Sequence, residues 1–303
     1  MSDWTTIAEG LRFPEGPVAC TAGSVIVVEI AAGRLTRIAA DGRTETVAET
    51  GGGPNGLAFG PNGLLYVCNN GGTAWREWRG MLIPSGKSND YVTGSIQRVD
   101  VATGKVETIY VDAADVALHG PNDLVFDAHG GFWFTDNGKS DPRSKTITGV
   151  FYAKADGSSC REVIFPLDGP NGIGLSPDGH TLYVSETPTC RLWAFDIVAP
   201  GEVALQPGVR GMGGRFVYSS PGLAGYDSLA VEQCGNIAVA TLASGGITVI
   251  APDGSLVEVV PTDDPFTTNI CWGGEDLRTA FVTLGGTGRL VKRDWPRAGL
   301  RLN

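Results

Sequence analysis

Six short phrases of the chain each carry a polar residue whose oxygen atoms could bind a hard metal cation. Residues 53–59 (GPNGLAF), 120–126 (GPNDLVF) and 169–175 (GPNGIGL) are near-copies of one another. Three looser copies are FPEGPV from residue 13, GYDSLA from residue 225 and TTNICW from residue 267. The polar residues are, in chain order, Glu15, Asn55, Asn122, Asn171, Asp227 and Asn269. Carboxylate and amide oxygens are the ligands that Ca²⁺, Mg²⁺ and Mn²⁺ prefer.

These residues act together only if the fold brings them to one place. Successive polar positions are 40 to 67 residues apart, and the shortest interval matches one four-stranded propeller blade. Each phrase leads into an apolar strand, and further hairpins are expected around the turns Asp41-Gly42, Asp156-Gly157 and Asp253-Gly254. No segment has a capped helical stripe. The sequence therefore predicts an all-β, six-bladed β-propeller that occupies residues 1–303 as one domain.

A propeller would give the polar residues a common position. The same place in each blade lies at the same height around the axis, so six side chains converge on the pore if each phrase leads into an innermost strand. Uncompensated carboxylates there would be costly, and this favours a bound divalent cation. The alternative is that Asn in Pro-Asn-Gly serves only the turn geometry. With three histidines and no Cys/His spacing, a structural zinc site is not expected.

The ordered set of phrases resembles the senescence-marker-protein (regucalcin)/gluconolactonase family of calcium-dependent six-bladed propellers. The resemblance runs from FPEGP at residue 13 to ICWGG at residue 270. It implies a metal site on the central axis, with Ca²⁺ expected, Zn²⁺, Mn²⁺, Mg²⁺ or Fe²⁺ as alternatives, and no organic cofactor. Residue by residue, it implies that Glu15, Asn171 and Asp227 bind the metal. Asp227 would also act as base, and Asn122 would bind metal, substrate or water.

Two further implications of the resemblance concern residues near these phrases. Asp136 and Ser228 stand where related lactonases hold a second, structural calcium. Sugar lactonases of the family tend to carry an arginine two residues before the third polar position, where it grips substrate hydroxyls. Here that position is Gly120. The resemblance therefore supports the fold and the metal more than it supports a simple sugar lactone as substrate.

An insertion at about residues 71–93 contains Trp75 and Trp78 with arginines between and after them. It is expected to be a loop, either a lid over an apolar or aromatic acid substrate or a segment folded on its own side chains at a dimer contact. Trp75, Trp78, Asn55 and Asn122 are the candidate substrate contacts. His119 is the only histidine near the expected pore, and it is either a proton carrier or structural.

Composition excludes several classes of function. The net charge of −10 opposes binding to nucleic acid. No apolar run has the length of a membrane span, and the first residues lead us to expect no signal peptide. The six scattered cysteines indicate mostly buried thiols in a reducing cytoplasm. Neither a Gly-x-Ser-x-Gly elbow nor a phosphate-binding loop is present. We expect a cytoplasmic monomer or homodimer with a small-molecule substrate.

Three hypotheses follow for the function. The first is a divalent-metal-dependent hydrolase that opens a lactone or cyclic ester by polarising the carbonyl for attack by water, with Asp227 as base and His119 as the outside candidate. The second keeps the site but acts on another ester or a phosphotriester, or transfers a proton without hydrolysis. The third is a non-catalytic propeller with a structural calcium, which metal removal would destabilise without any loss of activity.

Overall fold

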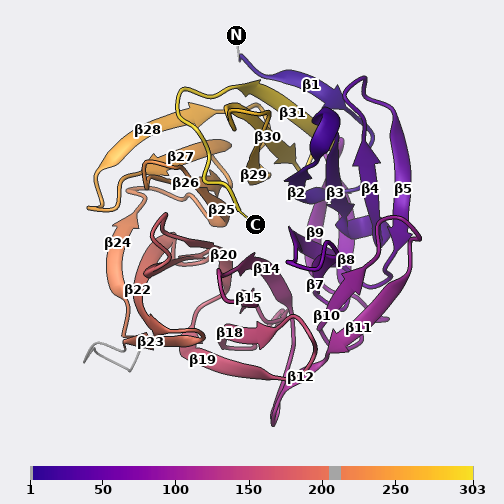
Figure 1. Cartoon of the computed structure of the whole chain (residues 1–303). Coiled ribbons are helices and arrows are strands. Elements are labelled where there is room, and N and C mark those ends of the chain that lie inside the picture. Colours follow the sequence, from indigo (N-terminus) through magenta and orange to yellow (C-terminus); the bar gives the residue numbers. More distant parts are fainter. Residues whose placement is uncertain (1–2, 205–212, 303) are drawn as a thin grey trace.

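The computed structural model describes residues 3–204 and 213–302, and Figure 1 shows their strands as a ring of sheets around a central axis. Each sheet is antiparallel and runs from an innermost to an outermost strand. The first three blades are β2 (Pro14–Ala19), β3 (Val25–Glu29), β4 (Arg34–Ile38) and β5 (Thr44–Glu49); β6 (Pro54–Phe59), β7 (Leu65–Asn69), β10 (Ser95–Val99) and β11 (Val106–Tyr110); and β14 (Pro121–Phe126), β15 (Gly131–Asp136), β18 (Thr148–Lys154) and β19 (Cys160–Leu167).

Three more blades complete the ring. They are β20 (Pro170–Leu175), β21 (Thr181–Glu186), β22 (Arg191–Ala199) with β23 (Glu202–Ala204) and β24 (Arg215–Ser219) both paired to it; β25 (Tyr226–Val231), β26 (Ile237–Thr241), β27 (Gly246–Ile250) and β28 (Leu256–Pro261); and β29 (Thr267–Gly273), β30 (Thr279–Leu284), β31 (Arg289–Asp294) and β1 (Thr5–Ala8). The expected all-β, six-bladed propeller is confirmed. The three expected hairpins are present as β4–β5, β18–β19 and β27–β28.

The N-terminal strand completes the last blade. β1 pairs antiparallel with β31, so the first strand is the outermost strand of the sixth blade. Ala8 at its end is buried in an apolar cluster that includes Val27 of blade 1 and Phe281 of blade 6. Because β1 joins the final sheet, the ring is closed by the hydrogen bonds between β1 and β31.

The polar phrases lie one strand further in than the sequence suggested. Each phrase is itself the innermost strand of its blade, with the polar residue near its start, and the apolar run that follows is the second strand. Second strands such as β3 (VIVVE) are buried on both faces, because neighbouring blades cover them. Their uninterrupted apolar character made them easier to recognise as strands than the glycine- and proline-containing phrases.

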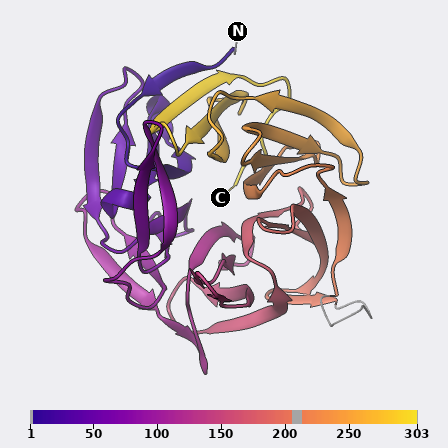
Figure 2. The same cartoon turned by 180° about the vertical axis from the view of Figure 1, so that it is seen from behind.

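Short elements decorate the loops. Two 3₁₀ turns lie in blade 1, η1 (Thr21–Gly23) and η2 (Ile30–Ala32). The 71–93 insertion contains a two-stranded hairpin, β8 (Thr73–Trp78) with β9 (Met81–Lys87), where the sequence suggested a loop. Smaller hairpins are β12 (Asp112–Ala113) with β13 (Val116–Ala117) and β16 (Ser140–Asp141) with β17 (Ser144–Lys145). The β8–β9 hairpin follows the second strand of blade 2 and therefore lies on the face where the innermost strands begin (Figure 2).

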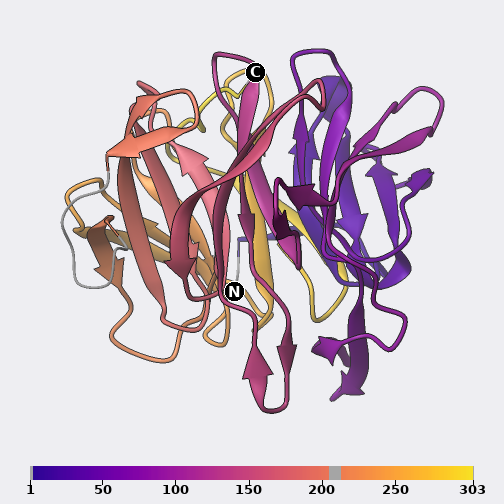
Figure 3. The same cartoon turned by 90° about the horizontal axis from the view of Figure 1, so that it is seen from below.

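Seen from the edge, the molecule has two distinct faces (Figure 3). The β8–β9 hairpin projects from one face, which we call the mouth face, and the C-terminus lies on the other, the rear face. Within residues 3–204 and 213–302, no helix has the length and apolarity needed to cross a bilayer. All six cysteines are free thiols: Cys68 is buried, Cys234 is exposed and the other four are half-buried, so the thiols are less completely buried than expected.

The closing strand provides a test of the fold. Ala8→Asp places a charge without a partner between blades 1 and 6 and should lower the free energy of unfolding by about 3 kcal/mol or more. Thr5→Asp, on the exposed part of the same strand, should change it by less than about 0.5 kcal/mol. Urea denaturation measures both. Equal small effects would mean that β1 does not close the ring.

Candidate metal centre and active site

The six polar residues do converge. Glu15, Asn55, Asn122, Asn171 and Asn269 are buried, and Asp227 is half-buried, each near the start of an innermost strand. Residues from opposite ends of the chain make contact here, because Asn269 Nδ2 donates a hydrogen bond to Glu15 Oε2 at 3.1 Å. The tertiary structure thus assembles the predicted oxygen-rich ring on the axis, at the mouth face.

A break in strand pairing accompanies each ring position. In blade 2, Pro54 lies opposite Asn69, but the next regular pair is Leu57 with Val67, so the register shifts across Asn55. Comparable shifts occur at or beside the ring residue in the other five blades. Such bulges redirect side chains and are frequent beside active sites. The repeated phrase therefore encodes an interruption of the ladder as well as a strand.

Glycine after the ring residue lets neighbouring innermost strands approach closely. A Cβ at Gly56 would lie 2.6 Å from the Asn122 carbonyl oxygen, and one at Gly172 would lie 2.5 Å from the Leu229 nitrogen. Gly16 is the equivalent residue of blade 1, where a Cβ would be 2.4 Å from the Asn55 carbonyl oxygen. These glycines are needed because each blade contacts the next through backbone at this height.

Blade 3 departs from this rule with Asp123, a site residue that the sequence reasoning missed. Asp123 stands where blades 1, 2 and 4 have glycine, and blade 5 has Ser228 there. Its Oδ1 accepts the Leu124 N–H at 2.9 Å, and its side chain interacts with Ser228 across the axis. The signal was available in the sequence, since Pro-Asn-Asp is the only one of the three near-identical phrases with an acid in this place.

The axis therefore holds three carboxylates instead of two. Burial raises the pKa of Glu15 well above its usual range, and the charges of Asp123 and Asp227 raise it further. Burial raises the pKa of Asp123 to about 7. Burial, together with the charge of Asp123, raises the pKa of Asp227 to about 7. Three full negative charges are unfavourable here unless a proton or a cation compensates them.

Two buried oxygen atoms of the ring have no hydrogen-bond partner among the described residues, Glu15 Oε1 and Asn122 Oδ1. A third oxygen, Asn171 Oδ1, receives only a long contact of 3.4 Å from the Ser228 hydroxyl. Unsatisfied buried acceptors call for a donor or a cation. The donor set is made of oxygen, which fits a hard divalent cation. No group of three or more His, Cys, Asp and Glu side chains in the described chain has the arrangement of a formed metal site.

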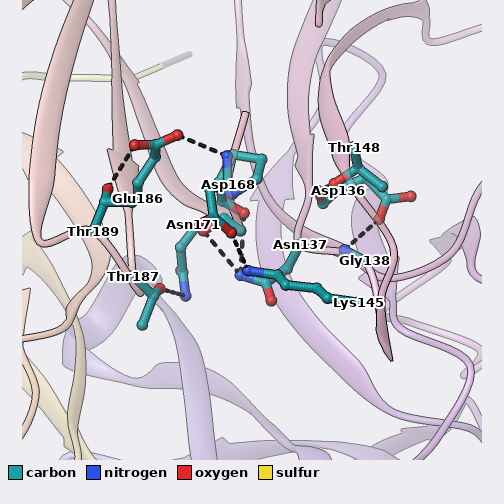
Figure 4. A network of polar contacts seen from close by, with 12 residues as sticks. Asp136, Asn137, Gly138, Lys145, Thr148, Asp168, Asn171, Glu186, Thr187 and Thr189 are labelled. Atoms are coloured by element: carbon teal, nitrogen blue, oxygen red, sulfur yellow. Dashed lines mark hydrogen bonds and ion pairs between the residues drawn. The ribbon is translucent and has the colours of Figure 1, made fainter. Parts of the chain in front are cut away.

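A second set of buried acceptors holds the loops that enter the innermost strands. In blades 1 to 4, the last residue of the second strand accepts a backbone N–H from the loop before its own innermost strand. The pairs are Glu29 with Arg12 at 2.8 Å, Asn69 with Gly53 at 2.9 Å, Asp136 with Gly120 at 2.8 Å, and Glu186 with Asp168 at 2.7 Å. Figure 4 shows the last of these beside Asn171, whose Nδ2 donates to Thr187 Oγ1 at 3.0 Å. These side chains set the starting positions of the ring residues.

The expected second calcium involves one of these acceptors. Both oxygens of Asp136 are used by the protein, since they accept N–H groups of His119, Gly120 and Gly138 at 2.7 to 2.8 Å. Ser228 lies instead with Asn171 and Asp123 on the axis. Asp136 therefore positions the backbone of the mouth loops. A second metal site formed by Asp136 and Ser228 stays a prediction.

His119 and Gly120 lie on the loop that Asp136 holds. His119 is half-buried, and its carbonyl oxygen accepts the Tyr91 hydroxyl at 2.9 Å. A Cβ at Gly120 would lie 2.5 Å from the Gly138 carbonyl oxygen, so the loop of blade 3 fills the space that a larger residue would need. An arginine at position 120 would therefore clash with the backbone at Gly138, and the single substitution Gly120→Arg would not fit this mouth without a shift of the loop.

The β8–β9 hairpin separates the two tryptophans. Trp75 packs its ring 4.8 Å from that of Phe13, whereas Trp78 is exposed and lies under the guanidinium of Arg79 at 4.7 Å. Residues three apart on a strand face opposite sides, so the pair does not form one aromatic surface. The hairpin also reaches blade 6, because the Leu82 N–H donates to the Gly286 carbonyl at 3.0 Å. It forms a wall at one side of the mouth.

A half-buried lysine ties the base of this hairpin to blade 3. The Lys139 ammonium donates to Asn70 Oδ1 and to the Gly72 carbonyl, both at 2.9 Å, and lies 5.3 Å from the centre of the Tyr91 ring. Burial lowers the pKa of Lys139 to about 8. This brace was not visible in the sequence, because its partners are about 70 residues away and belong to the neighbouring blade.

Comparison with known proteins identifies the family of the chain. A family model described as the SMP-30/Gluconolactonase/LRE-like region matches residues 13–286. The chain belongs to this family. The match contains all six innermost strands and therefore the whole ring of polar residues.

Two relatives of known name align with different lengths of this chain. The chain is 27% identical over 241 residues to a gluconolactonase of Zymomonas mobilis, covering 76% of this chain and 60% of that protein. It is 34% identical over 163 residues to lactonase drp35 of Staphylococcus saprophyticus, covering 54% of this chain and 48% of the relative. The chain thus spans about half to three fifths of the length of these two relatives.

Solved structures share the fold. A gluconolactonase from Xanthomonas campestris superposes with a TM-score of 0.75 at 24% identity, over 97% of this chain and 89% of the other. A protein described as the calcium-binding protein regucalcin, from Agrobacterium tumefaciens, gives a TM-score of 0.69 at 18% identity, over 97% and 93%. At these identities the likeness establishes the propeller.

The crowding of carboxylates on the axis gives a prediction about metal-free protein. Asp123→Asn keeps the acceptor for Leu124 and removes one charge, so at pH 8 it should stabilise chelator-treated protein by about 2 kcal/mol. Raised pKa values mean that the folded state gains protons as the pH falls through about 7, so the stability of the wild type should rise from pH 8 to pH 5.5 and the advantage of the variant should shrink.

Thermal unfolding at the two pH values measures this effect. Asp115→Asn, which removes an exposed carboxylate, is the matched control and should change little at either pH. A destabilised Asp123→Asn protein at pH 8 would show that this carboxylate is not electrostatically strained.

Proposed function

We propose that the protein is a divalent-metal-dependent lactonase that opens a lactone or related cyclic ester at the mouth of the propeller. The observation that carries the proposal is the oxygen-lined axis, with unpartnered Glu15 Oε1 and Asn122 Oδ1, in a chain of the gluconolactonase family. The two relatives compared above are a gluconolactonase and a lactonase, which supports lactone opening over other ester chemistry.

Glu15, Asn171 and Asp227 would hold the cation, with Asn122 beside them. Their oxygen donors and net negative charge suit Ca²⁺ first, and Zn²⁺, Mn²⁺, Mg²⁺ or Fe²⁺ are the alternatives. The likeness to a propeller described as calcium-binding supports this choice. When bound, the cation would supply Lewis-acid polarisation of the carbonyl and stabilise negative charge on its oxygen.

The chain's own residues would then manage substrate and proton. Water adds to the carbonyl carbon, the bond from that carbon to the ring oxygen breaks, and the product is a hydroxy acid. Asp227 would take a proton from the attacking water, and its place on the axis beside Asn171 supports this role. His119 on the mouth loop is the second candidate. Asn122 and Asn55 would donate their amide N–H groups to the ester oxygens.

The mouth also bears on substrate choice. Gly120 packed on Gly138 leaves no arginine to grip sugar hydroxyls, and Trp75 against Phe13 gives one wall an apolar surface. We therefore propose that the preferred lactone carries an apolar or aromatic substituent. Trp75 is the substrate contact in this proposal, and Trp78 at the exposed tip of the hairpin is less favourably placed.

The first experiment is hydrolysis of a lactone panel in a pH-stat. Sugar, alkyl and aromatic lactones would be tested after chelation and after adding back Ca²⁺, Mn²⁺, Mg²⁺ or Zn²⁺. We expect turnover to disappear on chelation and to return with at least one cation. Aryl esters and organophosphates run in parallel. Undiminished turnover in fully chelated protein, or turnover confined to the organophosphates, would contradict the proposal.

A pair of variants separates metal binding from proton transfer. Glu15→Gln should weaken cation affinity, measured by titration calorimetry, and its activity should recover in excess metal. Asp227→Asn keeps an oxygen ligand but cannot accept a proton, so kcat should fall by about 10²–10⁴-fold even at saturating metal. If Asp227→Asn retains full turnover with metal bound, the base is another group.

A further inference from the structure

Behind the ring of polar residues, the axis continues as an apolar chamber toward the rear face. Its volume is about 260 Å³, and all six innermost strands contribute to its wall. Representative wall residues, one from each blade in order, are Val18, Leu57, Leu124, Ile173, Leu229 and Cys271. The inner end of the chamber reaches Asp123 and Asn269, so it adjoins the candidate metal centre.

The other end of the chamber is covered by the C-terminal segment. Leu300, Arg301 and Leu302 line the chamber together with the strands. Figure 1 shows the C-terminus over the centre of the ring, and Figure 3 places it on the rear face, opposite the β8–β9 hairpin. The chain thus crosses from β31, the third strand of blade 6, to the axis after β31 ends at Asp294.

This crossing is firmly held. The buried carboxylate of Glu232 accepts hydrogen bonds from Trp295 Nε1 at 2.7 Å and from Arg297 Nε at 2.5 Å. Backbone N–H groups then attach the segment to two blades, since Gly299 donates to Leu277 and Leu300 donates to Val231, both at 2.9 Å. These bonds fix the segment as far as Leu300, and the exposed residues Arg301 and Leu302 follow directly on the rear face.

We propose that residues 300–302 are a plug that closes the axial channel from the rear, so that the candidate site exchanges water and solutes only through the mouth face. The wall of the chamber is mostly apolar, and its inner end carries the Asp123 carboxylate, whose charged form is sensitive to solvation. An open rear would admit water directly to Asp123. The inference is independent of lactone chemistry, because it concerns access to the axis and not what is bound there.

Cys271 is a reporter inside the chamber. Burial raises the pKa of its thiol to about 12, so it should react slowly in the intact protein. Cys68 is completely buried in the core between blades 2 and 3 and does not line the chamber, so it reports global opening. Cys234 is exposed and reports the reagent's own reactivity.

The test is alkylation of the full chain and of a variant that ends at Gly299, which retains Arg297 and its ion pair with Glu232. N-ethylmaleimide is the probe, and each cysteine is followed by peptide mass spectrometry. We expect Cys271 to react at least about tenfold faster in the variant, with Cys68 and Cys234 unchanged. An unchanged Cys271 rate would overturn the plug, and so would equal acceleration of Cys271 and Cys68, because the segment would then only stabilise the fold.

A full-length variant decides the question if the shortened chain does not fold. Leu300→Ala with Leu302→Ala narrows the plug but keeps the backbone bonds, and should accelerate Cys271 selectively. Leu256→Ala, which trims a half-exposed leucine on the outer strand β28, is the matched control and should leave the Cys271 rate unchanged. Equal rates in the double variant and the control would overturn the proposal.

Discussion

The burial of three carboxylates on one axis is the constraint around which this structure is organised. Glu15, Asp123 and Asp227 come from blades 1, 3 and 5, and the pKa of each is raised. Taking such groups out of water is expensive, and like charges add to the cost. The apolar clusters between the six pairs of neighbouring blades stabilise the fold against this cost. The negative charge on the axis must in addition be compensated by protons or by a cation.

The positions of these carboxylates depend on a second layer of buried acceptors. Glu29, Asn69, Asp136 and Glu186 fix the loops from which the innermost strands start, through bonds to backbone N–H groups. A site built this way is rigid, because moving a ring residue would break a buried hydrogen bond as well as a strand contact. Asp136 illustrates that an acid near a candidate site can serve the backbone.

The two ends of the axis differ in chemistry. The mouth face carries polar ring residues, a hairpin wall with Trp75 against Phe13, and the Lys139 brace. Toward the rear the axis is apolar and is covered by the end of the chain. This contrast supports the proposed placement of the site at the mouth, because charges beside apolar, water-poor surroundings interact more strongly than charges in water.

The sequence by itself determined the repeat, the blade number and the six ring residues, because each blade repeats one local pattern of polar residue, glycine and apolar strand. It also contained the signal for Asp123, in the single phrase with an acid in the glycine place. Only the tertiary structure decided that the phrases are the innermost strands, that Trp75 and Trp78 diverge, and that Lys139 and the C-terminal segment reach other blades. Those contacts join residues far apart in the chain, and local propensity carries no information about such pairs.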